Sequence, residues 1–357
     1  MLKTASRLIG SAILLVLSGL MVAFAHYAPD SLFAWYHGLS QSILSKVGRV
    51  TALLPFSLAE VLLYLLILWV IYDLVGVLRR RIGLLSWLAG LLEGASLLVF
   101  VFMAVWGLNY FDPTTTADRL GLEIRPYSTD ELRAATEYYL AQANDYAQRM
   151  ERDDSGTTAN VSFHALAERT ATGFDSLAEE YDGFAPSVQT PKPVLASAAM
   201  SYSGISGIFL CLTAEANVND DGPVWTLPFT MCHERAHAQG IAPENECNFV
   251  GFLAAIRSGN DLVAYSGYYH ALIYCYNALY SQNRDAASDI WSQRNAALAA
   301  DLNASIEHYR QFEGKVQQAA EKVNDTYLKT MEQSSGVKSY GEVADYLIAW
   351  YLAEQGG

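Results

Sequence analysis

Three long apolar segments in the first third of this 357-residue chain most limit the structures it can adopt. They cover about residues 8–26, 56–78 and 84–108. Each approaches the roughly 20 residues that an α-helix needs to cross a lipid bilayer. We therefore expect residues 1–110 to form a membrane anchor of three transmembrane helices, with the bilayer as the partner of this region.

Basic residues beside these segments predict how the anchor is oriented. Lys3 and Arg7 precede the first span, and Arg79, Arg80 and Arg81 follow the second. Basic residues concentrate on the cytoplasmic side of membrane proteins. This predicts a cytoplasmic N-terminus in a bacterial cytoplasmic membrane and an extracytoplasmic location for residues 111–357. The Ala23-Phe24-Ala25 segment also resembles a signal-peptidase site, and cleavage after Ala25 would export the same region.

Two features of the anchor allow more than one interpretation. Apolar residues at helical spacing over 31–50 predict an amphipathic helix at the membrane interface, which could also pack on the soluble region. Glu93 falls near the middle of the third span, where a charge is costly. It could belong to a transport pathway, but protonation or hydrogen bonding within the helical bundle is the simpler interpretation.

Charge separates the two parts of the chain. Residues 1–110 carry a net charge of +3 and residues 111–357 carry −17, which together give the total of −14. A strongly acidic exported region excludes nucleic acid as an expected partner and argues against adsorption to anionic lipid. Its four cysteines, Cys211, Cys232, Cys247 and Cys275, all lie in this region, so disulfides are possible but their pairing is not predicted.

The exported region is predicted to be mainly α-helical, with a small sheet. Helices are expected over 128–150, 164–181, 265–280 and most of 286–353, with a break near Gly336. Apolar, turn-bounded segments at 194–200 and 205–213 are the expected strands. A strand ahead of a catalytic helix could bind an extended peptide along its edge, or simply belong to the core.

The segment His233-Glu234-Arg235-Ala236-His237 matches the zinc motif HExxH. On a helix, residues four apart share a face, so the two histidines can bind one metal ion at about 2.0–2.1 Å. Glu234 would then lie beside the metal as a general base that activates water. Pro228 precedes the motif and Gly240 follows it, as expected at the start and end of a helix.

A third metal ligand is expected from the acidic residues that follow Pro243. Helical rise in an antiparallel second helix favours Glu246. The alternative is Glu244, because Asn248 lies four residues later, a spacing at which an Asn or Asp supports a metal-binding histidine in many zinc peptidases. Cys232, next to His233, is a conceivable thiolate ligand, although a small buried residue fits its position better.

A hydrogen-bond donor for the reacting carbonyl is also expected. Tyr265, or Tyr268 close by, could donate to the oxyanion of a tetrahedral intermediate. The chain has neither a GxSxG nucleophile elbow nor a GxxxxGK[ST] phosphate-binding loop. A serine hydrolase and a nucleotide-dependent enzyme are therefore unsupported.

Several segments together form a recognisable pattern. Besides the three spans, they are Gly204–Ile208 with Glu215-Ala216-Asn217, Leu227-Pro228-Phe229, the run from His233 to Phe249, Tyr265–Tyr268, Asn324–Lys329 and Ser339-Tyr340-Gly341. This pattern resembles the bacterial domain-of-unknown-function family 3810 over nearly the whole chain. The resemblance implies a membrane-anchored, zincin-like metallopeptidase, although Cys247 stands where that family usually has alanine.

For the site, the resemblance implies that His233, His237 and one of Glu244 or Glu246 bind the metal, with Glu234 as the base. It implies no particular peptide or protein substrate. Taken together, the sequence predicts a zinc-dependent metallopeptidase whose catalytic domain comprises residues 111–357. The alternative is a membrane-tethered, metal-binding regulatory protein without peptidase activity.

Overall fold

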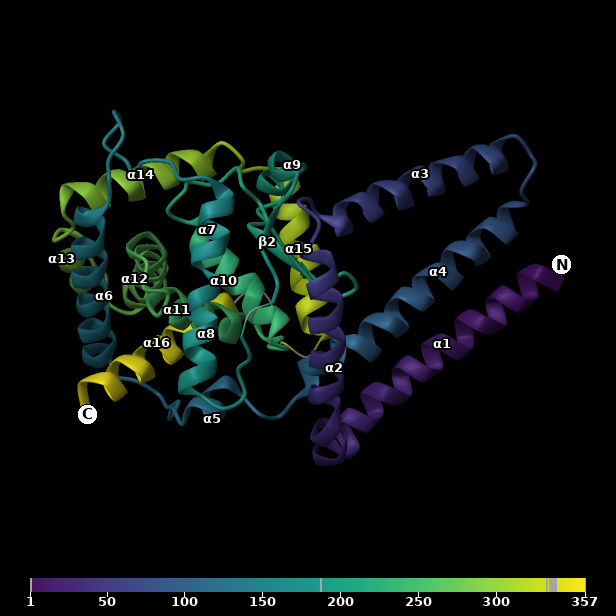
Figure 1. Cartoon of the computed structure of the whole chain (residues 1–357), viewed down its shortest axis with the longest axis horizontal. Helices are drawn as coiled ribbons and strands as arrows, with labels where there is room; N and C mark the ends of the chain where they lie inside the picture. Colours follow the sequence, from purple (N-terminus) through teal and green to yellow (C-terminus); the bar gives the residue numbers. More distant parts are fainter. Residues whose placement is uncertain (1, 187, 332, 334–338, 357) are drawn as a thin grey trace. The chain divides into compact units, whose positions relative to one another are not determined.

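The computed structural model describes residues 2–186, 188–331, 333 and 339–356. The structure is mainly α-helical with one small three-stranded sheet, which confirms the expected fold class (Figure 1). The chain divides into two compact units. Unit 1 comprises residues 1–113 and Leu210–Glu215, and unit 2 comprises Thr114–Phe209 and Ala216–Gly357.

Unit 1 contains three helices that are long and apolar enough to cross a membrane, as expected. They are α1 (Leu2–Tyr27), α3 (Leu58–Leu78) and α4 (Leu84–Val105). The other elements of this unit are α2 (Pro29–Thr51) and the short 3-10 helix η1 (Gly107–Phe111). Most side chains of α3 are exposed, as in a helix whose surroundings are lipid.

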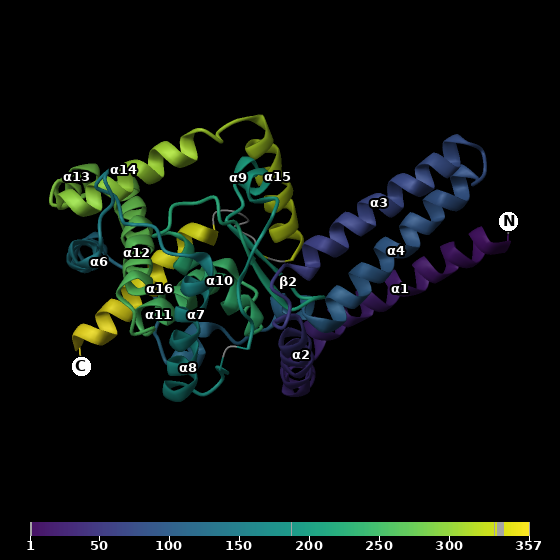
Figure 2. The same ribbon diagram turned by 45° about the horizontal axis from the view of Figure 1, so that its top comes forward.

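Helices α1 and α4 pack side by side and run in the same direction (Figures 1 and 2). Near the start of both, Arg7 Nη1 donates a hydrogen bond of 2.9 Å to the Ser86 carbonyl. Arg7 Nε also lies 3.4 Å from a carboxylate oxygen of Glu93. Glu93 therefore has a charged partner, Arg7, within the helical bundle, and the two interpretations of this residue stay predictions.

Helix α2 lies across the end of α4. The Tyr36 hydroxyl donates to the Met103 carbonyl at 3.3 Å, and the Ser40 hydroxyl donates to the Val105 carbonyl at 2.7 Å. The amphipathic helix expected over 31–50 therefore exists, and one of its faces is occupied by packing within unit 1. Its location at a membrane interface, the domain assignment and cleavage after Ala25 stay predictions.

The Leu210–Glu215 segment of unit 1 caps the start of α3. The two carboxylate oxygens of Glu215 accept hydrogen bonds from the backbone N–H groups of Leu58 and Ala59, at 3.0 and 2.8 Å. The Ser57 hydroxyl accepts a third bond, from the N–H of Glu60. These acceptors satisfy three of the four N–H groups that a helix start leaves unpaired.

Unit 2 holds the remaining helices, most of which surround a common hydrophobic core. They are α5 (Thr116–Leu120), α6 (Thr129–Arg149), α7 (Phe163–Arg169), α8 (Ala171–Glu180), α9 (Ser197–Tyr202), α10 (Leu227–Ala238), α11 (Glu244–Ile256), α12 (Asp261–Gln282), α13 (Arg284–Trp291), α14 (Ala296–Arg310), α15 (Lys315–Thr330) and α16 (Ser339–Gly356). The helix expected over 128–150 is confirmed by α6, whereas the one expected over 164–181 is divided at Thr170. The break expected near Gly336 lies outside the described residues.

The three strands are short, and their order in the sheet is β1-β3-β2. They are β1 (Lys192–Pro193), β2 (Gly207–Leu210) and β3 (Glu215–Val218), and β1 pairs with β3 in parallel. The strand expected over 205–213 contains β2. The strand expected over 194–200 is wrong, because most of that segment forms α9. Its Ser-Ala-Ala-Met composition has little β propensity, and the Ser197 hydroxyl bonds back to the Val194 carbonyl to form a turn.

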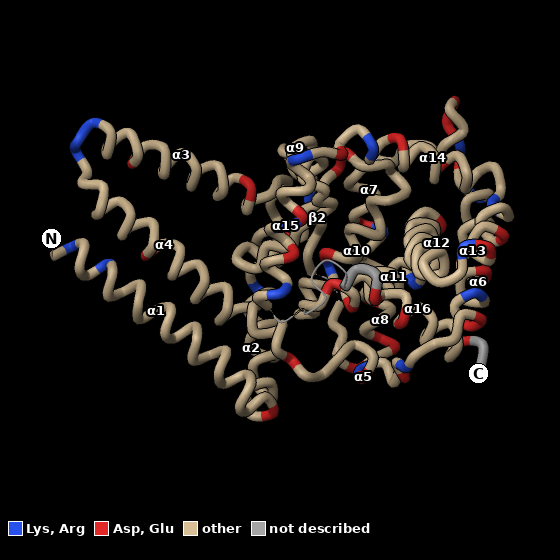
Figure 3. Tube along the Cα trace, turned by 180° about the vertical axis from the view of Figure 1, so that it is seen from behind, with Lys and Arg blue, Asp and Glu red and all other residues tan. Residues whose placement is uncertain are grey.

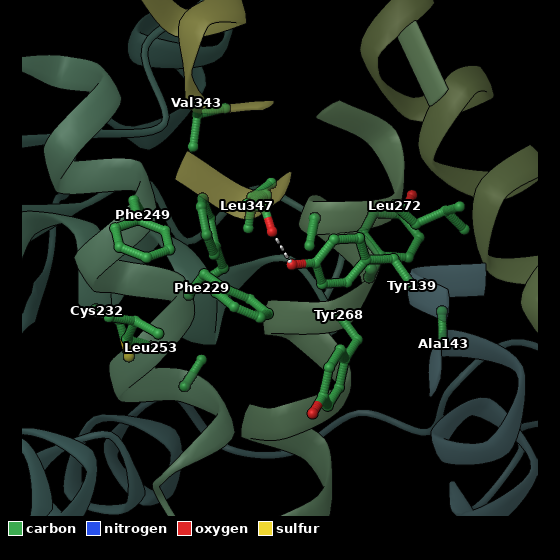
Figure 4. Close-up of a cluster of buried hydrophobic side chains, with 14 of the residues drawn as sticks. Tyr139, Ala143, Phe229, Cys232, Phe249, Leu253, Tyr268, Leu272, Val343 and Leu347 are labelled. Carbon is green, nitrogen blue, oxygen red and sulfur yellow. Dashed lines mark hydrogen bonds between the residues drawn. The ribbon is translucent and has the colours of Figure 1, made fainter. Parts of the chain in front are cut away.

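Helices α11, α12 and α16 pack together in the centre of unit 2, with α6 alongside (Figure 2). Aromatic side chains fill much of the space between them (Figure 4). The Tyr139 ring of α6 is fully buried, and its hydroxyl donates a 2.8 Å hydrogen bond to the Leu347 carbonyl of α16. This core holds α11 and α12 in fixed positions beside α10, the helix that carries the HExxH segment.

Candidate metal site

Helix α10 contains both histidines of the HExxH segment. Pro228 lies in its first turn, and Gly240, with φ of +83°, follows its end as expected. The chain then reverses, and α11 begins at Glu244 directly after the extended residue Pro243. Because α10 and α11 pack along each other, the first residue of α11 reaches the histidine-bearing face of α10.

His233, His237 and Glu244 form a compact group of possible metal ligands. One carboxylate oxygen of Glu244 lies 3.2 Å from Nε2 of His233 and 3.7 Å from Nε2 of His237. Two ligands bound tetrahedrally to zinc at about 2.1 Å lie roughly 3.4 Å apart. The two Glu244–histidine separations are of this size, and all three ligand atoms lie within 4.8 Å of one another, so this group could hold a metal ion.

The other ring nitrogen of each histidine is already hydrogen-bonded. Nδ1 of His233 lies 2.9 Å from Oδ1 of Asn248, and Nδ1 of His237 lies 2.9 Å from the Ile241 carbonyl. Both partners are acceptors, so Nδ1 carries the proton and Nε2 of each neutral ring keeps its lone pair. Partners of this kind commonly orient histidines that bind metals.

Glu234 lies on the same helix, with its carboxylate buried. One oxygen, Oε2, has no hydrogen-bond partner among the described residues, while the backbone N–H of Phe209 donates to the carboxylate. Burial raises the pKa of Glu234 to about 7, although the neighbouring His233 and His237 act against that rise. Such a carboxylate can both accept and release a proton near neutral pH.

Strand β2 approaches Glu234 so closely that any larger residue at position 207 would displace the Glu234 side chain. A Cβ atom added to Gly207 would lie 2.5 Å from Oε1 of Glu234 and 2.8 Å from its Cγ. Residue 207 therefore brings the strand backbone into contact with the carboxylate. The Gly204–Ile208 segment, which overlaps the strand expected over 205–213, is in this way part of the site.

A scan against known protein families matches residues 35–348 to the model described as "Protein of unknown function (DUF3810)". The chain belongs to the DUF3810 family. No curated protein and no solved structure matches it. Membership of DUF3810 confirms the resemblance seen in the sequence, and the family description gives no activity.

In this DUF3810 protein, Glu246 lies apart from the histidine pair. Its Oε2 accepts hydrogen bonds from both the backbone N–H of Thr116, at 2.7 Å, and the Thr116 hydroxyl, at 2.5 Å. The residue beside the histidines is therefore Glu244, the alternative of the sequence analysis. Glu246 instead bonds to Thr116 at the start of α5. Asn248 bonds to His233, as the four-residue spacing from Glu244 suggested.

The two tyrosines considered as carbonyl donors have other partners. The fully buried hydroxyl of Tyr265 donates to Asp301 at 2.7 Å. Tyr268 is buried against Tyr138 and Tyr146, with a hydrogen bond to Tyr138. The structure therefore does not bring Tyr265 or Tyr268 to the histidine group.

Sequence reasoning did not consider two residues of α12 that pack against Phe229, which lies one turn before His233 on α10. The His270 ring stacks on Phe229 of α10, with ring centroids 4.1 Å apart. Tyr274, one turn further along α12, has its ring centroid 6.2 Å from that of Phe229. Their spacing of four shows that they share one face of α12, but it does not show which face adjoins α10.

The cysteines do not join the candidate ligands. All four are buried and free. Burial raises the pKa of the Cys232 thiol to about 12, so Cys232 next to His233 is held as a neutral thiol. Cys247 lies behind the site, with its sulfur 3.2 Å from the Ile241 carbonyl.

Proposed function

We propose that this protein is a membrane-anchored zinc metallopeptidase. The observation that supports the proposal is the convergence of His233, His237 and Glu244 beside a buried, unpartnered oxygen of Glu234. A zinc ion bound by these three side chains would supply Lewis-acid chemistry that polarises a carbonyl and activates water. A purely structural zinc site would have no use for Glu234.

In this proposal the role of Glu234 is proton transfer. Its Oε2 atom accepts a proton from the attacking water, and the protonated carboxyl then donates that proton to the leaving amine. Oε2 is available for both steps, because it has no hydrogen-bond partner among the described residues. The backbone N–H of Phe209 lies beside the carboxylate and favours its charged form.

Strand β2 is the proposed binding edge for an extended substrate. It is an outer strand of the sheet, and the Ser206 carbonyl accepts a bond from Asn219 on the side of β3. Main-chain groups alternate in direction along a strand, so those of Gly207 and Phe209 point to the opposite side. That side is where Phe209 contacts Glu234, so a peptide added along this edge would pass beside the base.

The proposed location of the site is outside the cytoplasm. The contact between Arg7 and Ser86 places the chain start and the Arg79–Arg81 turn at the same end of the helices of unit 1 (Figure 3). Because basic residues concentrate on the cytoplasmic side of a membrane, this end of the helices, which carries both basic segments, is expected to face the cytoplasm. The residues that follow α4 would then be extracytoplasmic, in a bacterial cytoplasmic membrane.

The proposal is tested by comparing the full-length, detergent-solubilised protein with its Glu234→Gln variant. We expect the wild type to bind one zinc ion and to cleave members of a broad peptide library. The variant should retain zinc and lose on the order of 10³-fold in hydrolysis, because it lacks the proton acceptor. Glu246→Gln, which changes a buried carboxylate outside the site, is the matched control and should keep its activity.

Two results would reject this function. Equal hydrolysis by the wild type and Glu234→Gln would remove Glu234 as the base. Zinc binding without hydrolysis of any library member would instead favour a membrane-tethered, metal-binding regulatory protein.

A further inference from the structure

One face of α12 lies against the part of α10 that carries the histidines. Ser266, His270 and Tyr274 follow one another at intervals of four, so they share this face. The Ser266 hydroxyl accepts a 3.0 Å hydrogen bond from the backbone N–H of Phe229, and the His270 ring stacks on the Phe229 ring. Phe229 precedes His233 by one turn of α10. The α12 face therefore extends alongside the candidate ligands.

Nε2 of His270 and the hydroxyl of Tyr274 have no hydrogen-bond partner among the described residues. Nδ1 of His270 lies 2.8 Å from the Ser266 carbonyl, so it carries the ring proton and leaves Nε2 as an acceptor. The Tyr274 hydroxyl has no hydrogen-bond partner within the described part of the chain, and the residue is partly exposed. By contrast, the hydroxyls of Tyr265 and Tyr269 on the same helix are buried and donate to Asp301 and Ser305.

Burial and nearby charges determine the protonation state of both side chains. Burial raises the pKa of Tyr274, and the Glu244 carboxylate adds to that rise. The hydroxyl consequently keeps its hydrogen at physiological pH and can only act as a neutral donor or acceptor. Burial also lowers the pKa of His270 to about 4, with a contribution from His233, so this ring is uncharged and cannot donate from Nε2.

We propose that Tyr274 donates a hydrogen bond to the substrate carbonyl oxygen as that oxygen becomes negatively charged during hydrolysis. This inference rests on the proposed peptidase function and names the residue that stabilises the transition state. No proton is transferred in the step, since the hydroxyl keeps its covalent O–H bond throughout. Donors placed where negative charge develops contribute about 10²–10³-fold to kcat.

The test compares Tyr274→Phe with Tyr265→Phe in the full-length protein. Each variant loses one hydroxyl from α12 and keeps its ring. We expect Tyr274→Phe to lower kcat by about 10²–10³-fold, with unchanged KM and zinc content, and Tyr265→Phe to leave kcat unchanged. An equal kcat for Tyr274→Phe and the wild type would overturn the inference.

A second measurement does not depend on hydrolysis. Methylphosphonate, a tetrahedral anion, is titrated into the cobalt-loaded proteins and followed by the visible spectrum of cobalt. Tyr274→Phe should weaken phosphonate binding by about 10-fold or more, because a hydrogen bond to a charged group is lost. Unchanged phosphonate affinity, equal weakening by Tyr265→Phe, or no phosphonate binding by the wild type would each contradict the role of Tyr274.

The two measurements separate this inference from the proposed function. If the wild type cleaves no peptide, the peptidase proposal fails, and the phosphonate titration still decides whether Tyr274 contacts an anion at the site. If the wild type cleaves peptides and Tyr274→Phe cleaves them equally well, only the inference about Tyr274 fails.

Discussion

Asp301 and Glu244 are both buried carboxylates of unit 2, yet their surroundings differ. Asp301 accepts hydrogen bonds from Thr158 through its backbone N–H and its hydroxyl, from the Tyr265 hydroxyl and from Arg152, all at 2.7–2.8 Å. Glu244 instead has one oxygen directed at the Nε2 atoms of His233 and His237. Both nitrogens retain lone pairs when the rings are neutral.

The difference shows how a structural cluster can be distinguished from a candidate binding site. Around Asp301, four donors bond to the carboxylate, so its charge is compensated within the protein. Around Glu244, two lone pairs and a carboxylate converge on one point, while a neighbouring oxygen of Glu234 has no partner. Acceptors that converge in this way repel one another unless a proton or a cation lies between them.

The largest expected effect concerns two glutamates on the first turn of α11. Glu244→Gln should weaken zinc binding on the order of 10²–10³-fold, because roughly 10–16 kcal/mol of binding free energy is shared among about four ligands. Glu246→Gln should bind zinc as the wild type does, since its carboxylate bonds to Thr116. Competition with a fluorescent zinc chelator measures both affinities. Weaker binding only in Glu246→Gln would reverse the assignment.

A smaller effect is expected from substitution of Asp301, which lies in a cluster with Arg152, Thr158 and Tyr265. Asp301→Asn removes the charge that accepts the Arg152 hydrogen bond and should lower the free energy of unfolding by about 1.5–3 kcal/mol. Zinc affinity of the folded variant should not change. Thermal unfolding of the solubilised protein measures the loss, with Asp261→Asn, which breaks only an exposed ion pair with Arg149, as a control that changes stability by less than about 1 kcal/mol. A zinc affinity that fell with Asp301→Asn would remove the distinction between the two clusters.

The smallest expected effect concerns the residue that orients His233. Asn248→Ala removes the acceptor of the Nδ1 proton and should weaken zinc binding about 10–100-fold, without loss of a ligand. Asn245→Ala changes a partly exposed amide on the same helix and should have no effect. Chelator competition again provides the measurement, and equal affinities for the two variants would show that Asn248 does not orient the ligand.

Local spacing explains which parts of the site the sequence could predict. His233, Glu234 and His237 lie within five residues of one helix, so their geometry follows from helical periodicity alone. The choice between Glu244 and Glu246 depends on where α11 begins after the Gln239–Pro243 turn. Two residues on a helix differ by about 200° in direction, and the sequence does not specify that rotation.

The role proposed for Tyr274 on α12 could not be predicted from the sequence for a similar reason. Tyr265 and Tyr274 are nine residues apart, which places them on opposite faces of the helix at about 100° per residue. Apolar and aromatic side chains occur on all sides of α12, because the helix is buried in the core. The sequence therefore gives no indication of which face adjoins α10.

The short strands were only partly predictable. Strand β2 has four residues and lies within a longer apolar segment, whereas β3 was not predicted. Its Glu215-Ala216-Asn217-Val218 sequence has little β propensity, and pairing with β1 is a tertiary contact. The apolar membrane segments, by contrast, are recognisable from length and composition alone.

The central claim is that His233, His237 and Glu244 bind one metal ion. X-ray absorption spectroscopy of the zinc-loaded, full-length protein tests it most directly. We expect two imidazole nitrogens and oxygen ligands at about 2.0–2.1 Å, with the imidazole signal lost in His233→Ala. A sulfur ligand at about 2.3 Å, or a spectrum without imidazole, would contradict the claim.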